Sequence, residues 1–92
     1  MAETVKPADI AVTVRLFASL REAAGTGRLE LRLPEATPVA GVWERLPARV
    51  RRGSAPSGSR WAVNHEWAAA DRPLRDGDEV ALVTPVSGGA GG

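Results

Sequence analysis

Apolar and polar residues alternate along several stretches of the chain, which is the pattern of a β-strand with one face on a core. The apolar row of the first predicted strand consists of Ile10, Val12, Val14 and Leu16. A second alternating row, formed by Leu29, Leu31 and Leu33, predicts a half-buried strand that ends at Pro34 and pairs with the first. The apolar run from Val80 to Thr84 predicts the closing strand. Shorter strands at 61–63 and 66–67, joined by Asn64-His65, predict a hairpin with a tight turn.

Two stretches between these strands have helical character. Residues 18–24 are rich in helix formers and precede Gly25, a residue suited to the left-handed cap position, so we expect a short helical turn. Thr37 followed by Pro38 is a helix start signal, with Thr37 as the N-cap. An apolar stripe at helical spacing follows, formed by Val39, Val42, Trp43, Leu46 and Val50. We expect the main helix here, packed on the sheet, with Pro47 kinking or ending it.

This order of elements predicts an α+β fold, a ubiquitin-like β-grasp in which a mixed sheet packs on one main helix. We expect a disordered leader at residues 1–9, a β-grasp domain at 10–84 and a flexible Gly-rich tail at 85–92. The alternative is a ferredoxin-like split, which needs a second full helix near residues 66–76. Pro73 and Gly77 leave little room for that helix.

The composition limits the class of protein. Ninety-two residues with 43% hydrophobic content suffice for one domain. There is no cysteine, so the chain has no disulfide, no thiolate metal site and no sulfur nucleophile of its own. No apolar run of membrane-spanning length and no signal peptide is present, so we expect a cytoplasmic protein with no membrane association. A net charge of +1 argues against a dedicated nucleic-acid binder.

The chain ends in two glycine pairs, Gly88-Gly89 and Gly91-Gly92. Glycine loses more conformational freedom on folding than any other residue, so we expect this tail to stay mobile unless a partner holds it. A tail with so few side chains can enter a narrow channel in another protein and present its α-carboxylate. The alternative is a frayed Gly-rich end without a function.

Three other features are candidates for function. Phe17 points away from the apolar row of the first strand and is a candidate partner contact, although a second small core could equally hold it. His65, the only histidine, is interpreted as a turn residue and not as a base or ligand. Arginines from Arg45 to Arg60 suggest a positive strip, either a solvated helix end or a docking patch. No residue cluster suggests a metal site.

Four separated segments together resemble a known family. They are Val14–Glu22 (VRLFASLRE), Ala62–Glu66 (AVNHE), Pro73–Val80 (PLRDGDEV) and Pro85–Gly89 (PVSGG). In this order they resemble the MoaD/ThiS-type sulfur carriers, and the first and last segments favour the branch of the small subunit of molybdopterin synthase over the thiamine branch. Family members usually stop at the first Gly-Gly, whereas this chain continues with Ala90-Gly91-Gly92.

The resemblance implies a chemistry for the tail. A ubiquitin-activating-like adenylyltransferase would use ATP to adenylate the terminal glycine, and the sulfur of a persulfide donor protein would displace AMP and leave a thiocarboxylate. The large subunit of molybdopterin synthase would receive the tail and pass the sulfur to a pterin precursor. The reacting residue would be Gly89 after Gly88, or alternatively Gly92 after Gly91.

In this view the chain is the non-catalytic sulfur-carrying subunit, with no permanently bound cofactor. Its partner contacts would be Phe17, Pro85, Val86 and Ser87. Three other functions stay open: a sulfur carrier for another product such as cysteine or thiamine thiazole, a ubiquitin-like protein modifier, and a stand-alone interaction domain with an idle tail.

Overall fold

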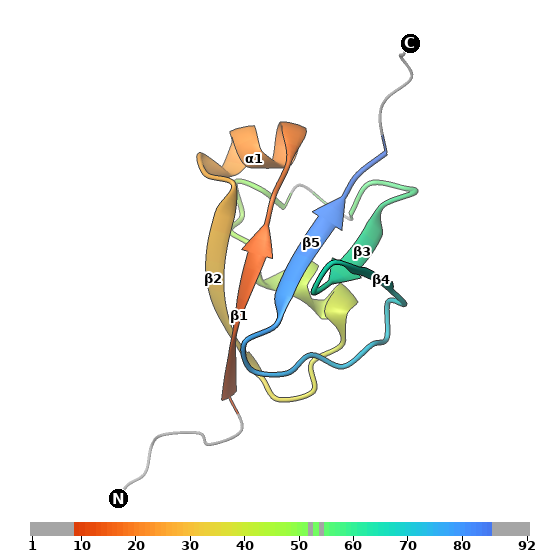
Figure 1. Ribbon diagram of the computed structural model, residues 1–92. Coiled ribbons are helices and arrows are strands. Elements are labelled where there is room, and N and C mark those ends of the chain that lie inside the picture. The colour runs from red at the N-terminus through yellow and green to blue at the C-terminus, as the bar shows by residue number, and fades with distance from the viewer. Residues whose placement is uncertain (1–8, 52, 54, 86–92) are drawn as a thin grey trace, which may run out of the picture.

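A computed structural model describes residues 9–51, 53 and 55–85 and shows a five-stranded sheet (Figure 1). The strands are β1 (Asp9–Arg15), β2 (Arg28–Pro34), β3 (Arg60–Val63), β4 (Glu66–Ala68) and β5 (Glu79–Val83). Their spatial order is β2-β1-β5-β3-β4. β1 and β5 are parallel, and the other neighbouring pairs are antiparallel. This confirms the predicted mixed sheet and the pairing of the first two strands.

One face of the sheet forms the core because the alternating apolar rows all point to that side. The buried side chains from the strands are Ile10, Val12, Val14, Leu33, Trp61, Val63, Val80 and Leu82. The predicted helical stripe covers them, and every member of that stripe is buried, as expected. Full burial of a Val, Leu or Ile side chain contributes roughly 1.5–3 kcal/mol, so this face is the main source of stability.

The segment beneath the sheet is a 3₁₀ helix, η1 (Val39–Arg45), and not the α-helix that the spacing predicts. The amide of Gly41 donates to the carbonyl of Pro38 at 2.8 Å, three residues back. Prolines at 38 and 47 bracket the element, and Gly41 with two β-branched valines inside it lowers the helix propensity. Short 3₁₀ pieces suit such a segment, and the buried stripe is preserved.

The predicted N-cap is also wrong. Pro38 occupies the N-cap position of η1, without a side-chain cap. The Thr37 hydroxyl instead donates to the carbonyl of Pro34 at 2.6 Å, closing the turn that leaves β2. Thr37 therefore stabilises the end of the strand and not the start of the helix.

The short helix α1 (Ala18–Ala24) agrees with the sequence pattern. Gly25 ends it with φ +80°, and its amide donates to the Arg21 carbonyl at 2.9 Å. Leu20 and Ala24 on its inner face join the core. The Arg49 guanidinium donates to the carbonyl of Ala24 at 3.1 Å and ties the helix to the chain that follows η1.

The predicted hairpin turn is confirmed, because Asn64 and His65 both have positive φ, +52° and +73°. Residues 66–76 form β4 and turns, so the helix that a ferredoxin-like fold requires is absent there. Several strand boundaries differ by one residue from expectation: β1 ends at Arg15 although Leu16 stays buried, and β5 runs from Glu79 to Val83 and not from Val80 to Thr84. Asp9 already belongs to β1, and the rest of the expected leader, 1–8, lies outside the described residues.

A buried carboxylate organises the end of the sheet at which β5 begins. Asp78 is only 7% exposed. It accepts hydrogen bonds from the Arg75 amide at 2.8 Å and the Asn64 side chain at 2.9 Å, and the Arg72 guanidinium lies 3.4 Å away. Burial raises the pKa of Asp78, but these hydrogen bonds outweigh it and hold the pKa below its ordinary value. The network fixes the hairpin turn against the start of β5.

Candidate functional site

The outward face of the sheet carries an apolar cluster. Among the described residues three large apolar side chains are exposed: Phe17 (46%), Trp67 (58%) and Val83 (37%). All three line one hollow of about 330 Å³. Scattered exposed apolar residues are normal, whereas three gathered around one hollow form a candidate surface for interaction.

The strand register explains how the hollow forms. Ala62 on β3 pairs with Ala81 on β5 and, on its other side, with Trp67 on β4. Two small side chains therefore lie in the middle of the outward face, and Trp67 stands at its edge. Alternation along β5 brings Val83 to the same face as Ala81.

Phe17 reaches this surface from the connection between β1 and α1. Its backbone is extended, with φ −132° and ψ 161°, and its carbonyl accepts the amides of Leu20 and Arg21 at 3.1 and 3.3 Å. The side chain is exposed, as the strand alternation predicts, and a second small core does not cover it. Its role as a partner contact remains a prediction.

Trp67 is held in place by Arg60. The guanidinium of Arg60 lies 4.0 Å from the centroid of the indole ring, in cation–π geometry. Such a contact contributes about 0.5–1 kcal/mol at an exposed position. The contact favours one orientation of the indole on the edge strand.

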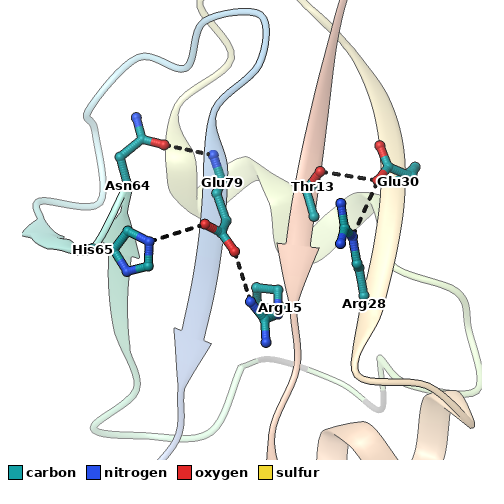
Figure 2. A network of polar contacts seen from close by, with 7 residues as sticks. All are labelled: Thr13, Arg15, Arg28, Glu30, Asn64, His65 and Glu79. Atoms are coloured by element: carbon teal, nitrogen blue, oxygen red, sulfur yellow. Dashed lines mark hydrogen bonds and ion pairs between the residues drawn. The ribbon is translucent and has the colours of Figure 1, made fainter.

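A polar network borders the hollow (Figure 2). Glu79 accepts a hydrogen bond from the Arg15 guanidinium at 2.9 Å, and the His65 ring nitrogen Nε2 lies 3.3 Å from its other oxygen. The hydrogen bond from Arg15 is the main cause that lowers the pKa of Glu79. The backbone amide of Glu79 donates to the Asn64 side chain at 3.0 Å.

Sequence reasoning missed this network. It interpreted His65 correctly as a turn residue, but the turn also places the imidazole beside Glu79 at the rim of the hollow. The parallel pairing of β1 with β5, which brings Arg15 to Glu79, joins segments from opposite ends of the chain. No local pattern in the sequence predicts that pairing of β1 with β5.

The tail leaves the sheet beside this surface. β5 lies between β1 and β3, and after Val83 the chain passes through Thr84 to an exposed Pro85, at the end of the sheet where α1 lies (Figure 1). A Cβ added at Gly58 would lie 3.5 Å from the Pro85 ring, so the loop before β3 runs alongside.

Of the predicted site residues, the structure places Phe17 and Pro85 at this end of the sheet. The remaining ones lie outside the described residues: Val86, Ser87, Gly88, Gly89, Gly91 and Gly92. Within the described ranges, no group of three His, Asp or Glu residues could hold a metal ion. Across the same ranges, no helix is long and apolar enough to cross a membrane. The described surface is thus suited to docking a protein, with the tail beginning next to it.

Comparison with known proteins agrees with these features. A model of the ThiS family matches residues 14–89. The chain is 36% identical to the molybdopterin synthase sulfur carrier subunit of Escherichia coli, over 85% of this chain and 99% of that protein. A solved structure from Pyrococcus furiosus, assigned as molybdopterin converting factor subunit 1, is 30% identical with a TM-score of 0.68, covering 84% of this chain and 99% of that one.

The structure of SAMP1 from Haloferax volcanii, a small archaeal modifier protein, is 27% identical with a TM-score of 0.70. It covers 86% of this chain and 99% of its own. These likenesses confirm the ubiquitin-like β-grasp predicted from the order of elements.

Proposed function

Because the chain belongs to the ThiS family, we propose that it is a sulfur carrier for molybdopterin synthesis, acting in the cytoplasm as the small, non-catalytic subunit of the synthase. One observation carries this proposal: the 36% identity to the sulfur carrier subunit of Escherichia coli molybdopterin synthase over nearly all of that protein. The family match also extends through the first glycine pair to Gly89. The reacting group is then the terminal carboxylate.

The proposed chemistry begins with activation, since a carboxylate is a poor electrophile. An adenylyltransferase partner transfers AMP from ATP to the terminal glycine and releases pyrophosphate. The outer sulfur of a persulfide on a donor protein attacks the acyl carbon, and AMP leaves. A second thiol then attacks the donor sulfur of the resulting acyl disulfide and frees the thiocarboxylate. Both sulfur groups come from partners because this chain has no cysteine.

The folded domain contributes docking. The apolar hollow runs along the outward face from Glu79, where β5 begins, to Val83, where it ends, so a partner seated on Phe17, Trp67 and Val83 lies next to the start of the tail. The proposed occupants are the adenylyltransferase and the synthase large subunit, which bind in turn. Glycines at the end let partner sites close around backbone without a Cβ.

The reacting end is proposed to be Gly89, after removal of Ala90-Gly91-Gly92. An extended chain spans about 3.3–3.6 Å per residue, so ending at Gly92 moves the carboxyl by up to roughly 10 Å. Reacting atoms must approach within about 3–3.5 Å, so one partner site cannot serve both ends. A chain stopped at Gly89 should accept sulfur without any protease. If that form is inactive while the full-length chain reacts, the mature end is Gly92.

The test of the function is intact-protein mass spectrometry. The Gly89-terminated protein is incubated with its adenylyltransferase, ATP and a persulfide donor. We expect the mass gain of one oxygen-to-sulfur exchange, lost when ATP is omitted or when Gly89 is deleted. The protein that has gained sulfur should then convert a pterin precursor in the presence of the synthase large subunit. Absence of any exchange with the cognate adenylyltransferase would refute the carrier function.

A second candidate function is protein modification, which the likeness to SAMP1 favours. In that case the activated glycine would form an isopeptide with lysine amines of other proteins. The same incubation without a sulfur donor separates the two, since a modifier yields conjugates on lysine and a carrier does not. If sulfur is accepted but no pterin is converted, the carrier serves another product, such as cysteine or thiamine thiazole.

A further inference from the structure

A second hollow, of about 300 Å³, lies next to the apolar one and is basic. Its lining includes Arg15 from β1, Arg21 from α1 and Arg28 from β2, together with Leu16, Phe17 and Gly27. Three arginines thus contribute to its lining, and no acidic residue is among the lining residues. We call this set the arginine pocket.

The folded chain gains little from this arrangement. Arg15 and Arg28 are direct partners across β1 and β2, and like charges directly opposite each other destabilise a sheet. Each has one acidic neighbour: Glu79 lies 2.9 Å from Arg15, and Glu30 lies 3.6 Å from Arg28 (Figure 2). The Arg28 side chain is 67% exposed, so its ion pair contributes little.

Arg21 adds a positive charge that has no acidic partner to balance it among the described residues. No acidic side chain in those ranges forms an ion pair with it, and it projects from the last turn of α1. The pocket therefore has room and positive charge for a group that the chain itself does not supply.

The arginine pocket is continuous with the docking surface. Arg15 and Phe17 line both hollows. Helix α1 lies at the end of the sheet where β5 ends and the tail begins (Figure 1). Any protein that covers Phe17 also reaches the guanidiniums. Arg side chains bind carboxylates with two parallel hydrogen bonds, which fixes orientation as well as adding attraction.

We propose that the arginine pocket receives an acidic side chain, Asp or Glu, of the protein that accepts the tail, and that it steers and orients docking. This rests on the proposed function, because it takes the tail-accepting proteins as the occupants. Arg15 and Arg28 are already paired with Glu79 and Glu30, which leaves one net positive charge in the cluster, enough for a single carboxylate and too little for an extended phosphate backbone. The net charge of +1 likewise favours a protein partner over a nucleic acid.

The test uses two double variants of the full chain that lose the same charge. Arg21→Gln with Arg28→Gln alters the pocket. Arg32→Gln with Arg75→Gln is the matched control, on exposed arginines that line neither hollow. Stopped-flow binding to the adenylyltransferase and to the synthase large subunit is measured at low and high salt, after melting curves show that both variants fold.

We expect the pocket variant to associate roughly tenfold more slowly at low salt, with a flattened salt dependence, because loss of steering acts on the association rate. The control should stay within about twofold of the parent. Equal rates for both variants with both partners would overturn the proposal. Binding of a labelled oligonucleotide that depends on the pocket, with unchanged protein docking, would overturn it as well.

The same experiments distinguish failure of the docking inference from failure of the proposed function. If the parent docks through the pocket but never gains sulfur, the carrier function fails and the docking inference stands. If the parent gains sulfur and the pocket variant docks at the parent rate, only the docking inference fails. A parent chain that binds neither partner refutes both.

Discussion

Replacing Asp78 by alanine should show how much the fold depends on one buried carboxylate. The variant loses two short hydrogen bonds, from the Arg75 amide and the Asn64 side chain, and a longer contact with Arg72. A hydrogen bond to a charged group contributes about 1.5–3 kcal/mol, and the freed donors regain part of this from water. We therefore expect the free energy of unfolding to fall by about 2–3 kcal/mol at pH 7. For a domain of this size each kcal/mol lowers Tm by roughly 4–8 °C.

The pH dependence gives an independent check of the same mechanism. The folded-state pKa of Asp78 lies below its unfolded value, so its contribution is fully present above the unfolded value of about 3.9. The contribution is lost as the pH falls through the lower folded-state pKa. The gap in stability between the parent and Asp78→Ala should accordingly narrow in strongly acidic solution.

Urea unfolding, followed by tryptophan fluorescence, measures both effects. Trp43 and Trp61 are buried and report loss of the core. The parent, Asp78→Ala and Asp78→Asn are compared at pH 7 and at successively lower pH, with Asp71→Ala as a control for an exposed carboxylate outside this network. A gap below about 0.5 kcal/mol at pH 7, the range of ordinary surface changes, would refute the reasoning. So would a gap that stays constant as the solution is acidified.

Three other changes test the packing, the turn and the docking surface. Leu46→Ala should lower the free energy of unfolding by about 2–5 kcal/mol because it leaves a cavity in the core. Deletion of Ser87–Gly92 should change that free energy by less than about 0.5 kcal/mol. If urea unfolding shows that the deletion destabilises the protein more than Leu46→Ala does, the tail is packed structure. His65→Gly should raise stability by about 0.5 kcal/mol, since relief of a left-handed φ, about 1–2, exceeds the added chain entropy of about 0.4–1; a lower Tm would contradict this. Trp67→Ala should weaken binding to the synthase large subunit roughly tenfold, as for a typical interface anchor, and lower Tm by about 2–8 °C through loss of the Arg60 contact. Titration calorimetry showing equal affinity would exclude the hollow as the interface.

The core was predictable from the sequence because local periodicity sets it. Alternation along 10–16 and 29–33 identified the buried rows, and the spacing from Val39 to Val50 identified the stripe that covers them. Glycine and Asn-His signals placed the end of α1 and the hairpin turn. These features depend on residues that are close together in the sequence, so they can be predicted from a single sequence.

The type of the covering helix could not be predicted from its stripe. Only Val39, Val42 and Trp43 of the stripe lie within η1, and over so short a segment their spacing suits an α-helical turn and a 3₁₀ turn alike. The two prolines that bracket η1 favour the short 3₁₀ form. The hydroxyl of Thr37 had two acceptable uses, as a cap or as a donor to the strand before it, and only the path of the chain selects one.

The surface features depend on distant pairings and were missed for that reason. Basic residues cluster in the sequence from Arg45 to Arg60, but the fold disperses that cluster: Arg49 donates to a carbonyl and Arg60 lies on Trp67. The arginine pocket instead combines residues from β1, α1 and β2. Phe17 was found because strand alternation alone puts it outward.

The central place of β5 also determines when this protein can fold. The strand made last during synthesis lies between β1 and β3, so a chain still growing on the ribosome has a sheet divided into two parts. Thr13 on β1 pairs with Glu79 on β5, and contacts between residues so far apart in the sequence slow folding. The sheet can close only after translation has passed Val83, the last residue of β5. A nascent chain that stops before β5 therefore leaves β1 and β3 with unpaired edges, and such edges favour aggregation.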